Sequence, residues 1–175
     1  RILDLSYVRQ ESGTLRIGAL ATHAQLEHSE LLKTYSPLLP QTAKTIGDVQ
    51  VRNQGTVGGS LAHADPAGDL PAAILAVEAE MKASGSSGER WIKAEDFFVG
   101  FLTSCLAPDE ILTEIKIPLR RGSKTAYLKA AQRASGFAVA GVAVCLELAK
   151  DGRCEDIAIG VTGVADKAYR AATVE

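Results

Sequence analysis

Residues 141–161 place the strongest constraint on the fold of this chain. Apolar residues alternate with small or polar ones on both sides of Asp151-Gly152, a dipeptide that favours a two-residue β-hairpin turn. The register set by this turn forms three apolar cross-strand pairs: Leu146–Ile157, Val144–Ile159 and Val142–Val161. Because strand side chains alternate in direction, the six share one face, and we expect a helix or another sheet to cover it.

The remaining segments mix strand-like and helix-like patterns, which predicts an α+β architecture. Alternation predicts a hairpin over 1–20, a strand–turn–strand over 79–94 and a strand over 109–118, with Ile111, Thr113, Ile115 and Ile117 on one face. Apolar spacing and caps predict helices over 22–35 (N-cap Thr22), 40–46 (ended by Gly47), 69–78 (N-cap Asp69) and 95–104. The polar segment 119–125 is the best candidate for a linker.

Composition excludes several classes of protein. The chain has 175 residues, of which 46% are hydrophobic and 23% charged, as in soluble globular proteins. A net charge of −2 argues against nucleic acid or an anionic membrane as the main partner, and no apolar stretch is long enough for an integral membrane segment.

The cysteines and histidines give no sign of a metal centre. The three cysteines have no C-x-x-C spacing, which favours reduced thiols in a cytoplasmic protein; only Cys145 and Cys154 could meet, across the hairpin. The three histidines lack a metal-ligand arrangement with cysteine or carboxylate, so we expect the chain to carry no metal of its own.

The glycine-rich stretch over residues 51–71, VRNQGTVGGSLAHADPAGDLP, is the most informative for function. It spells neither G-x-G-x-x-G nor a P-loop, so nicotinamide and Walker nucleotide sites are disfavoured. Two interpretations remain open: a turn that needs glycine, or a loop whose bare backbone N–H groups hold a phosphate. In the second, Arg52 is the nearest cation, and Asp69 would either cap a helix or accept hydrogen bonds from ligand hydroxyls.

Residues 15–26 (LRIGALATHAQL), 51–79 and 109–118 (DEILTEIKIP) resemble the FAD-binding medium subunit of the molybdenum hydroxylases. That family includes aerobic carbon monoxide dehydrogenase, xanthine dehydrogenase and 4-hydroxybenzoyl-CoA reductase. The resemblance covers essentially the whole chain. It implies an α+β fold of mixed sheets flanked by helices, with an FAD-binding domain over 1–119 and a partial C-terminal α/β flavoprotein domain over 120–175.

The resemblance also implies roles for individual residues. The loop along the FAD pyrophosphate matches Thr56, Val57, Gly58, Gly59 and Ser60. Asp69 matches an aspartate that hydrogen-bonds the flavin polyol, and Ile46 an apolar side chain against the flavin. Leu112 matches a residue whose backbone lies near the isoalloxazine ring, and Lys129 a lysine at the flavin edge. The alternative is a core position for Ile46 and Leu112 and a solvated one for Lys129.

By this resemblance the protein is an electron-transfer subunit and an FAD-dependent oxidoreductase component, with no catalytic acid, base or nucleophile of its own. FAD would pass electrons to NAD or another acceptor. The molybdenum cofactor and [2Fe-2S] clusters would lie on partners, a molybdenum large subunit and an iron–sulfur small subunit, in a dimer of heterotrimers. The alternatives are another flavoenzyme with the same general fold, or a cofactor-free assembly module.

One family feature has no counterpart in the sequence. The family's earlier glycine loop, A-G-G-x-[ST], is missing, and the C-terminal domain has about half the length that the family implies. We therefore expect a segment of a flavoprotein subunit that retains little FAD by itself.

Overall fold

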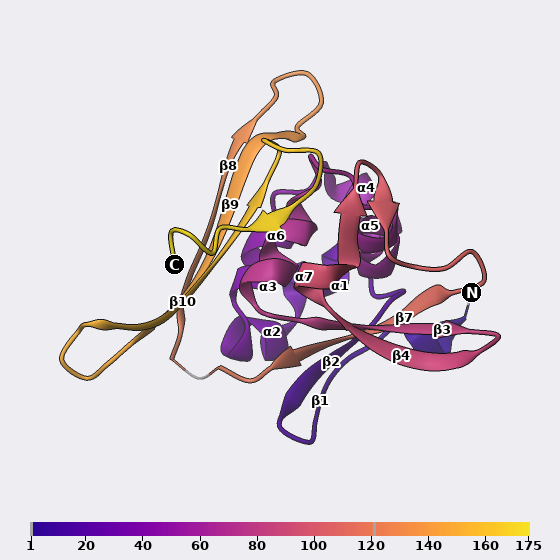
Figure 1. Cartoon of the computed structure of the whole chain (residues 1–175), viewed down its shortest axis with the longest axis horizontal. Coiled ribbons are helices and arrows are strands. Elements are labelled where there is room, and N and C mark those ends of the chain that lie inside the picture. The colour runs from indigo at the N-terminus through magenta and orange to yellow at the C-terminus, as the bar shows by residue number, and fades with distance from the viewer. Residues whose placement is uncertain (1, 121) are drawn as a thin grey trace.

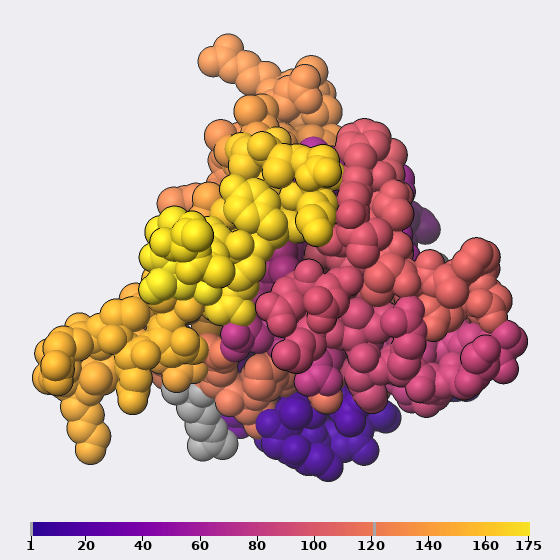
Figure 2. All heavy atoms as spheres, viewed as in Figure 1, coloured from indigo at the N-terminus to yellow at the C-terminus, as the bar shows by residue number. Residues whose placement is uncertain are grey.

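A computed structural model describes residues 2–120 and 122–175. It contains two antiparallel sheets with a layer of helices between them (Figure 1). The first sheet has the order β1-β2-β7-β3-β4 and the second the order β11-β10-β9-β8; β5 and β6 form a separate hairpin. Seen from the side shown in Figure 2, strands and the C-terminal segment hide most of the helical layer.

The bounds of the elements follow. The helices are η1 (Leu3–Leu5), α1 (His23–His28), α2 (Glu30–Tyr35), α3 (Leu38–Ala43), α4 (Val49–Gln54), α5 (Val57–His63), α6 (Asp69–Ala76) and α7 (Ala94–Phe97). The strands are β1 (Val8–Glu11), β2 (Thr14–Gly18), β3 (Glu80–Gly85), β4 (Gly88–Lys93), β5 (Phe98–Gly100), β6 (Thr103–Ser104), β7 (Ile111–Pro118), β8 (Lys124–Ala131), β9 (Ala138–Leu148), β10 (Cys154–Thr162) and β11 (Tyr169–Arg170).

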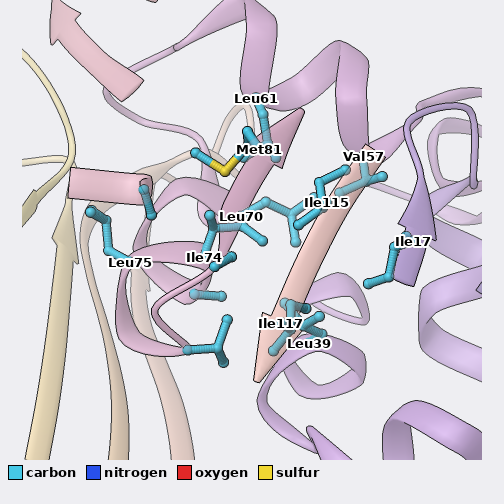
Figure 3. Packing of buried hydrophobic residues seen from close by; sticks show 14 of the residues in the cluster. Ile17, Leu39, Val57, Leu61, Leu70, Ile74, Leu75, Met81, Ile115 and Ile117 are labelled. Atoms are coloured by element: carbon cyan, nitrogen blue, oxygen red, sulfur yellow. The ribbon is translucent and has the colours of Figure 1, made fainter. Parts of the chain in front are cut away.

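The main core lies between the first sheet and the helices. Ile17, Met81 and Ile115 point from β2, β3 and β7 toward Leu61 of α5 and Leu70 of α6, and all five are fully buried (Figure 3). Strands β2 and β3 alternate as the sequence predicts, because every second side chain faces the helices. The hairpin over residues 79–94 is confirmed, with β3–β4 antiparallel. The hairpin expected over 1–20 is confirmed only for β1 and β2, because Leu3–Leu5 form the 3-10 helix η1 and not a strand; residue 1 lies outside the described residues.

The predicted register of the β9–β10 hairpin is confirmed, with Leu146 opposite Ile157 and Val142 opposite Val161. The expected buried face is wrong. Helix α6 packs on the opposite face, which carries small residues such as Ala143, Ala158 and Gly160. The reason is distance: a β-carbon on Gly160 would lie 2.0 Å from the Ala72 carbonyl oxygen, so only a nearly bare backbone brings sheet and helix this close.

The other face of the second sheet is therefore its outer face. One cross-strand row on it is formed by Leu128, Val142, Val161 and Tyr169. Leu128 has 77% of its surface exposed, and Val142 and Tyr169 have 39% and 38%. The large apolar side chains of this hairpin thus face outward and the small ones inward.

Three local predictions need correction. The helix expected over 22–35 is two helices, because Ser29 ends α1 and caps α2; the Thr22 cap is confirmed and forms a capping box with Gln25. The helix expected over 95–104 is only α7, followed by the β5–β6 hairpin. In β7, Leu112 faces the core and Ile111 is exposed, because the pairing with β3 shifts register between Lys82 and Ala83.

The remaining predicted segments agree in part. The helix expected over 40–46 is α3, which begins at Leu38, and Gly47 follows it with a φ of +46°. Part of the expected linker belongs to β8, and Arg121 lies outside the described residues. Cys145 and Cys154 do not meet, since they lie opposite Ala158 and Leu148. No helix in the described part of the chain is long and apolar enough to span a bilayer.

Candidate functional site

The TVGGS segment begins a helix. The Thr56 side chain is the N-cap of α5 and accepts a hydrogen bond of 3.1 Å from the Gly59 N–H. Neither Gly58 nor Gly59 has a positive φ, so the interpretation of a turn that needs glycine for its conformation is wrong. The loop interpretation is also corrected, since Val57, Gly58, Gly59 and Ser60 lie in the first turns of α5.

The two glycines have different environments. A β-carbon on Gly58 would lie 2.5 Å from the Ala19 side chain and 2.7 Å from its carbonyl oxygen, so Gly58 allows α5 to pack against the end of β2. Gly59 is exposed, and a β-carbon there would meet only the Thr56 hydroxyl, at 2.9 Å. Packing against the backbone of Ala19 thus explains Gly58, whereas a β-carbon on Gly59 would displace only the Thr56 hydroxyl.

Gly59 lies in an open cleft with a volume of about 270 Å³. Thr56 and Gly58 line the same cleft, and so does Leu112, which comes from the distant strand β7. Ala19, Leu20, Ala62, Leu106, Glu110 and Ile111 complete the lining. Four of the residues that the sequence assigned to one site therefore meet in one cleft. Val57 does not belong to it, because its side chain is fully buried in the core.

Glu110, which lines this cleft, is already paired, and so is Arg52, the cation considered for the phosphate. Arg90 donates two hydrogen bonds to the Glu110 carboxylate, and these hold the pKa of Glu110 down at about 2. Arg52 binds Glu27 at 2.8 Å and donates to the carbonyl oxygens of Ile46 and Gly47. Arg52 therefore stabilises the α3–α4 turn. The sequence had suggested it as a partner for a phosphate, but its guanidinium group is already bound.

Asp69 and Lys129 form a buried ion pair apart from the cleft. The Lys129 ammonium lies 3.0 Å from Asp69 Oδ2, and each side chain has only 8% of its surface exposed. Lys129 also donates to the Thr45 carbonyl oxygen at 2.8 Å and to the Gly136 carbonyl oxygen at 2.9 Å. Its three N–H groups are thus all used, and the alternative of a solvated lysine is wrong.

Asp69 is the first residue of α6 and does not cap it. The N-cap position is Gly68, and no side chain caps this helix. Both carboxylate oxygens of Asp69 are instead bound from β8, Oδ2 by Lys129 and Oδ1 by the hydroxyl of Tyr127 at 2.5 Å. Burial raises the pKa of Asp69, and the bonds from Tyr127 and Lys129 oppose that rise.

The sequence analysis missed Tyr127. Its hydroxyl is buried, and burial together with the bond to Asp69 raises its pKa. Space for the hydroxyl comes from Gly141 on β9, where a β-carbon would lie 2.6 Å from the Tyr127 oxygen. A glycine in the middle of a strand was the available signal, since such glycines mark a close approach of another group.

Two further residues predicted from the sequence to bind the cofactor are Ile46 and Ser60. Ile46 is partly buried against the core, and its carbonyl oxygen is held by Arg52. Ser60 is half-buried in α5. The described residues include no group of three or more His, Cys, Asp or Glu side chains placed to hold a metal ion.

Comparison with known proteins identifies the family to which this fold belongs. Residues 1–120 match the family model described as the FAD binding domain in molybdopterin dehydrogenase. The chain is 40% identical over 175 residues to the glyceraldehyde dehydrogenase medium chain of Sulfolobus acidocaldarius, covering all of this chain and 62% of the relative.

Solved structures agree with the fold. The structure superimposes on carbon monoxide dehydrogenase from Hydrogenophaga pseudoflava with a TM-score of 0.93 and 40% identity, covering 98% of this chain and 60% of the other. For quinoline 2-oxidoreductase from Pseudomonas putida 86 the TM-score is 0.89 at 30% identity, with 97% and 59% covered.

The chain belongs to the FAD-binding domain family of the molybdopterin dehydrogenases, whose cofactor is FAD and whose relatives are oxidoreductase subunits. The predicted α+β fold is confirmed. The chain spans about 60% of the length of these relatives.

Proposed function

We propose that this chain forms one wall of an FAD site in the electron-transfer subunit of a cytoplasmic molybdenum hydroxylase. The observation that carries the proposal is the meeting of Thr56, Gly58 and Gly59 with Leu112 in one cleft. Leu112 lies more than fifty residues from the other three in the sequence, and the resemblance assigned all four to flavin binding. Their common cleft supports a shared ligand.

The residues present fit a part of FAD. Gly59 has no β-carbon, so a ligand can approach the chain closely there. The Gly59 N–H is bound to the Thr56 hydroxyl, whose own O–H can donate to an oxygen of the diphosphate. Mostly apolar residues such as Leu106 and Leu112 line the other side, which suits an aromatic ring system. A cleft of about 270 Å³ takes only part of a dinucleotide, so the remainder would be held elsewhere.

When bound, FAD supplies the redox chemistry, accepting electrons and passing them to NAD or another acceptor. The residues of this chain bind and orient. Gly59 allows close approach, Thr56 offers a hydroxyl, and Leu112 excludes water from the apolar side of the cleft. No described side chain in the cleft is required to transfer a proton. Electrons would arrive from [2Fe-2S] clusters of a small subunit, and substrate would be oxidised at the molybdenum cofactor of a large subunit.

The experiment is an FAD titration of the subunit that carries this chain, followed by absorbance. Stoichiometric binding and reduction of the bound FAD on mixing with the reduced iron–sulfur subunit are expected. A subunit that assembles with both partners but binds no FAD would instead be a cofactor-free assembly module. The 175-residue chain serves as a second sample, and it is expected to retain little FAD.

A further inference from the structure

The buried cluster beside the α3–α4 turn has a member to which the resemblance assigned no role. Tyr127 has 9% of its surface exposed, and its hydroxyl donates to Asp69 Oδ1 at 2.5 Å. The hydroxyl occupies space that a β-carbon on Gly141 would otherwise fill. The second sheet is thus built to bring a phenol hydroxyl to this carboxylate.

Without the second sheet, little in α6 itself would orient the Asp69 carboxylate. Asp69 makes no capping bond to α6, and its two side-chain hydrogen-bond partners in the described part of the chain come from β8. The ammonium group of Lys129 fixes the position of Oδ2. The carboxylate could still rotate about that contact, and the bond from Tyr127 to Oδ1 fixes this rotation. A carboxylate held at two points keeps its remaining lone pairs in fixed directions.

The cluster is connected to the predicted flavin-contacting segment. Lys129 donates to the Thr45 carbonyl oxygen, and Arg52 donates to those of Ile46 and Gly47, so the α3–α4 turn is held from two sides. Helix α4, which carries Arg52, ends at Gln54, two residues before the Thr56 cap of α5. The position of Asp69 and Lys129 therefore affects the position of the α3–α4 turn, which contains Ile46.

We infer that Tyr127 is a positioning residue of the FAD site, which acts by fixing the Asp69 carboxylate that Lys129 also binds. The inference rests on the proposed function. Tyr127 does not touch the ligand in this role; it sets the direction in which Asp69 accepts hydrogen bonds and, through Lys129, the place of the α3–α4 turn.

The test compares Tyr127→Phe with Tyr7→Phe in the complete subunit. Tyr7 is a matched control, because its hydroxyl also donates at 2.5 Å to a carboxylate, that of Glu114, on the outer face of the first sheet. FAD affinity and the melting temperature of the apoprotein are measured for both. We expect Tyr127→Phe to weaken FAD binding about tenfold, the size of effect typical of one lost bond to a charged group, and Tyr7→Phe to leave it unchanged.

A double-mutant cycle separates positioning from packing. If Tyr127 acts through Asp69, the tenfold loss shrinks to less than about twofold when Tyr127→Phe is made in the Asp69→Asn background. An equal loss in both backgrounds, or unchanged FAD binding by Tyr127→Phe, would overturn the inference and leave the proposed function standing. So would an apoprotein of Tyr127→Phe that melts more than about 10 °C below that of Tyr7→Phe, since the role would then be structural. A parent subunit without FAD overturns both proposals, and this result is distinct from a loss confined to the variant.

Discussion

Gly58 lies against Ala19 so closely that a β-carbon on Gly58 would come within 2.7 Å of the Ala19 carbonyl oxygen. Its neighbour Gly59 has no such contact with the backbone. Packing thus accounts for Gly58, and close approach of a ligand is our proposal for Gly59.

We therefore expect Gly58→Ala to lower the stability of the apoprotein and Gly59→Ala to lower its affinity for FAD. Gly58→Ala overpacks the contact with β2 and is expected to destabilise the apoprotein by about 2 kcal/mol. Gly59→Ala replaces a glycine in an exposed helical position, which favours the helix by up to about 1 kcal/mol, less the cost of moving the Thr56 hydroxyl. Its apoprotein should be nearly as stable as the parent, while FAD binding falls more than about tenfold because the cleft is partly filled.

Denaturant unfolding and FAD titration of both variants check this prediction. Normal FAD affinity of Gly59→Ala would show that the diphosphate does not approach the chain at this residue, and most of the site assignment would then be wrong.

Replacement of Lys129 by methionine should leave a buried, unpaired Asp69 carboxylate. We expect a loss of about 3 kcal/mol near neutral pH, typical of a buried ion pair that has lost one partner. Burial already raises the pKa of Asp69, and loss of Lys129 raises it further above the unfolded value of 3.8. The folded variant then binds a proton that the unfolded chain does not, so the stability difference from the parent shrinks as the pH falls.

Urea unfolding of Lys129→Met and the parent at about pH 7 and about pH 5 measures this difference. Lys33→Met is the control, because Lys33 pairs with Glu30 on the surface of α2. A pH-independent difference would mean that Asp69 is not the group left unpaired.

His23 should make the fold sensitive to mild acid. The side chain is 5% exposed, its Nδ1 has no hydrogen-bond partner, and it packs beside Gly55. Burial lowers the pKa of His23 below its usual value of 6.5. A lowered pKa favours the neutral form in the folded state, so this contribution to stability is present above pH 6.5 and is lost as the pH falls below it.

We expect His23→Gln to flatten the pH dependence of the melting temperature between about pH 7 and about pH 5. His28→Gln, at an exposed position five residues later, should leave the slope as in the parent. Equal slopes in all three proteins would assign the acid sensitivity to other groups.

Gly160→Ala tests the packing of the second sheet on α6. The new methyl group would meet the Ala72 carbonyl oxygen, so we expect a loss of several kcal/mol or an insoluble protein. Gly152→Ala in the same hairpin meets no atom within 4 Å but has a φ of +84°, and it should cost only about 1 kcal/mol. Comparable melting temperatures of the two variants would contradict the observed contact.

The sequence predicted the pairing of the strands better than it predicted which of their faces is buried. The β9–β10 register followed from Asp151-Gly152, because turn geometry and side-chain alternation are local properties. The prediction of the buried face was wrong, because that face is decided by α6, whose close approach to Gly160 is a tertiary contact. Side-chain size alone assigned the core to the large residues, whereas the helix required the small ones.

In the candidate site, too, some features were predicted from the sequence and others depend on tertiary contacts. The resemblance assigned Gly59 and Leu112 to one ligand site, and the fold brings the two residues to one cleft. The helical state of TVGGS was missed because two adjacent glycines disfavour a helix in isolation, and only the Thr56 cap and the contact with Ala19 reveal it. Tyr127 was missed because its partner Asp69 is distant in the sequence and the bond exists only after the second sheet has packed on α6.

The burial of α6 has a consequence for biosynthesis. All eight residues of this helix are buried, partly against β9 and β10, which leave the ribosome long after α6 does. Until those strands are made, an almost wholly apolar helix and the open face of its layer are exposed to solvent. Contacts between segments so distant in the chain form slowly, and the waiting intermediate is prone to aggregate. Yield in a heterologous host should therefore depend on chaperones that bind nascent chains, and nonsense or frameshift lesions before β10 should produce insoluble rather than partly active protein.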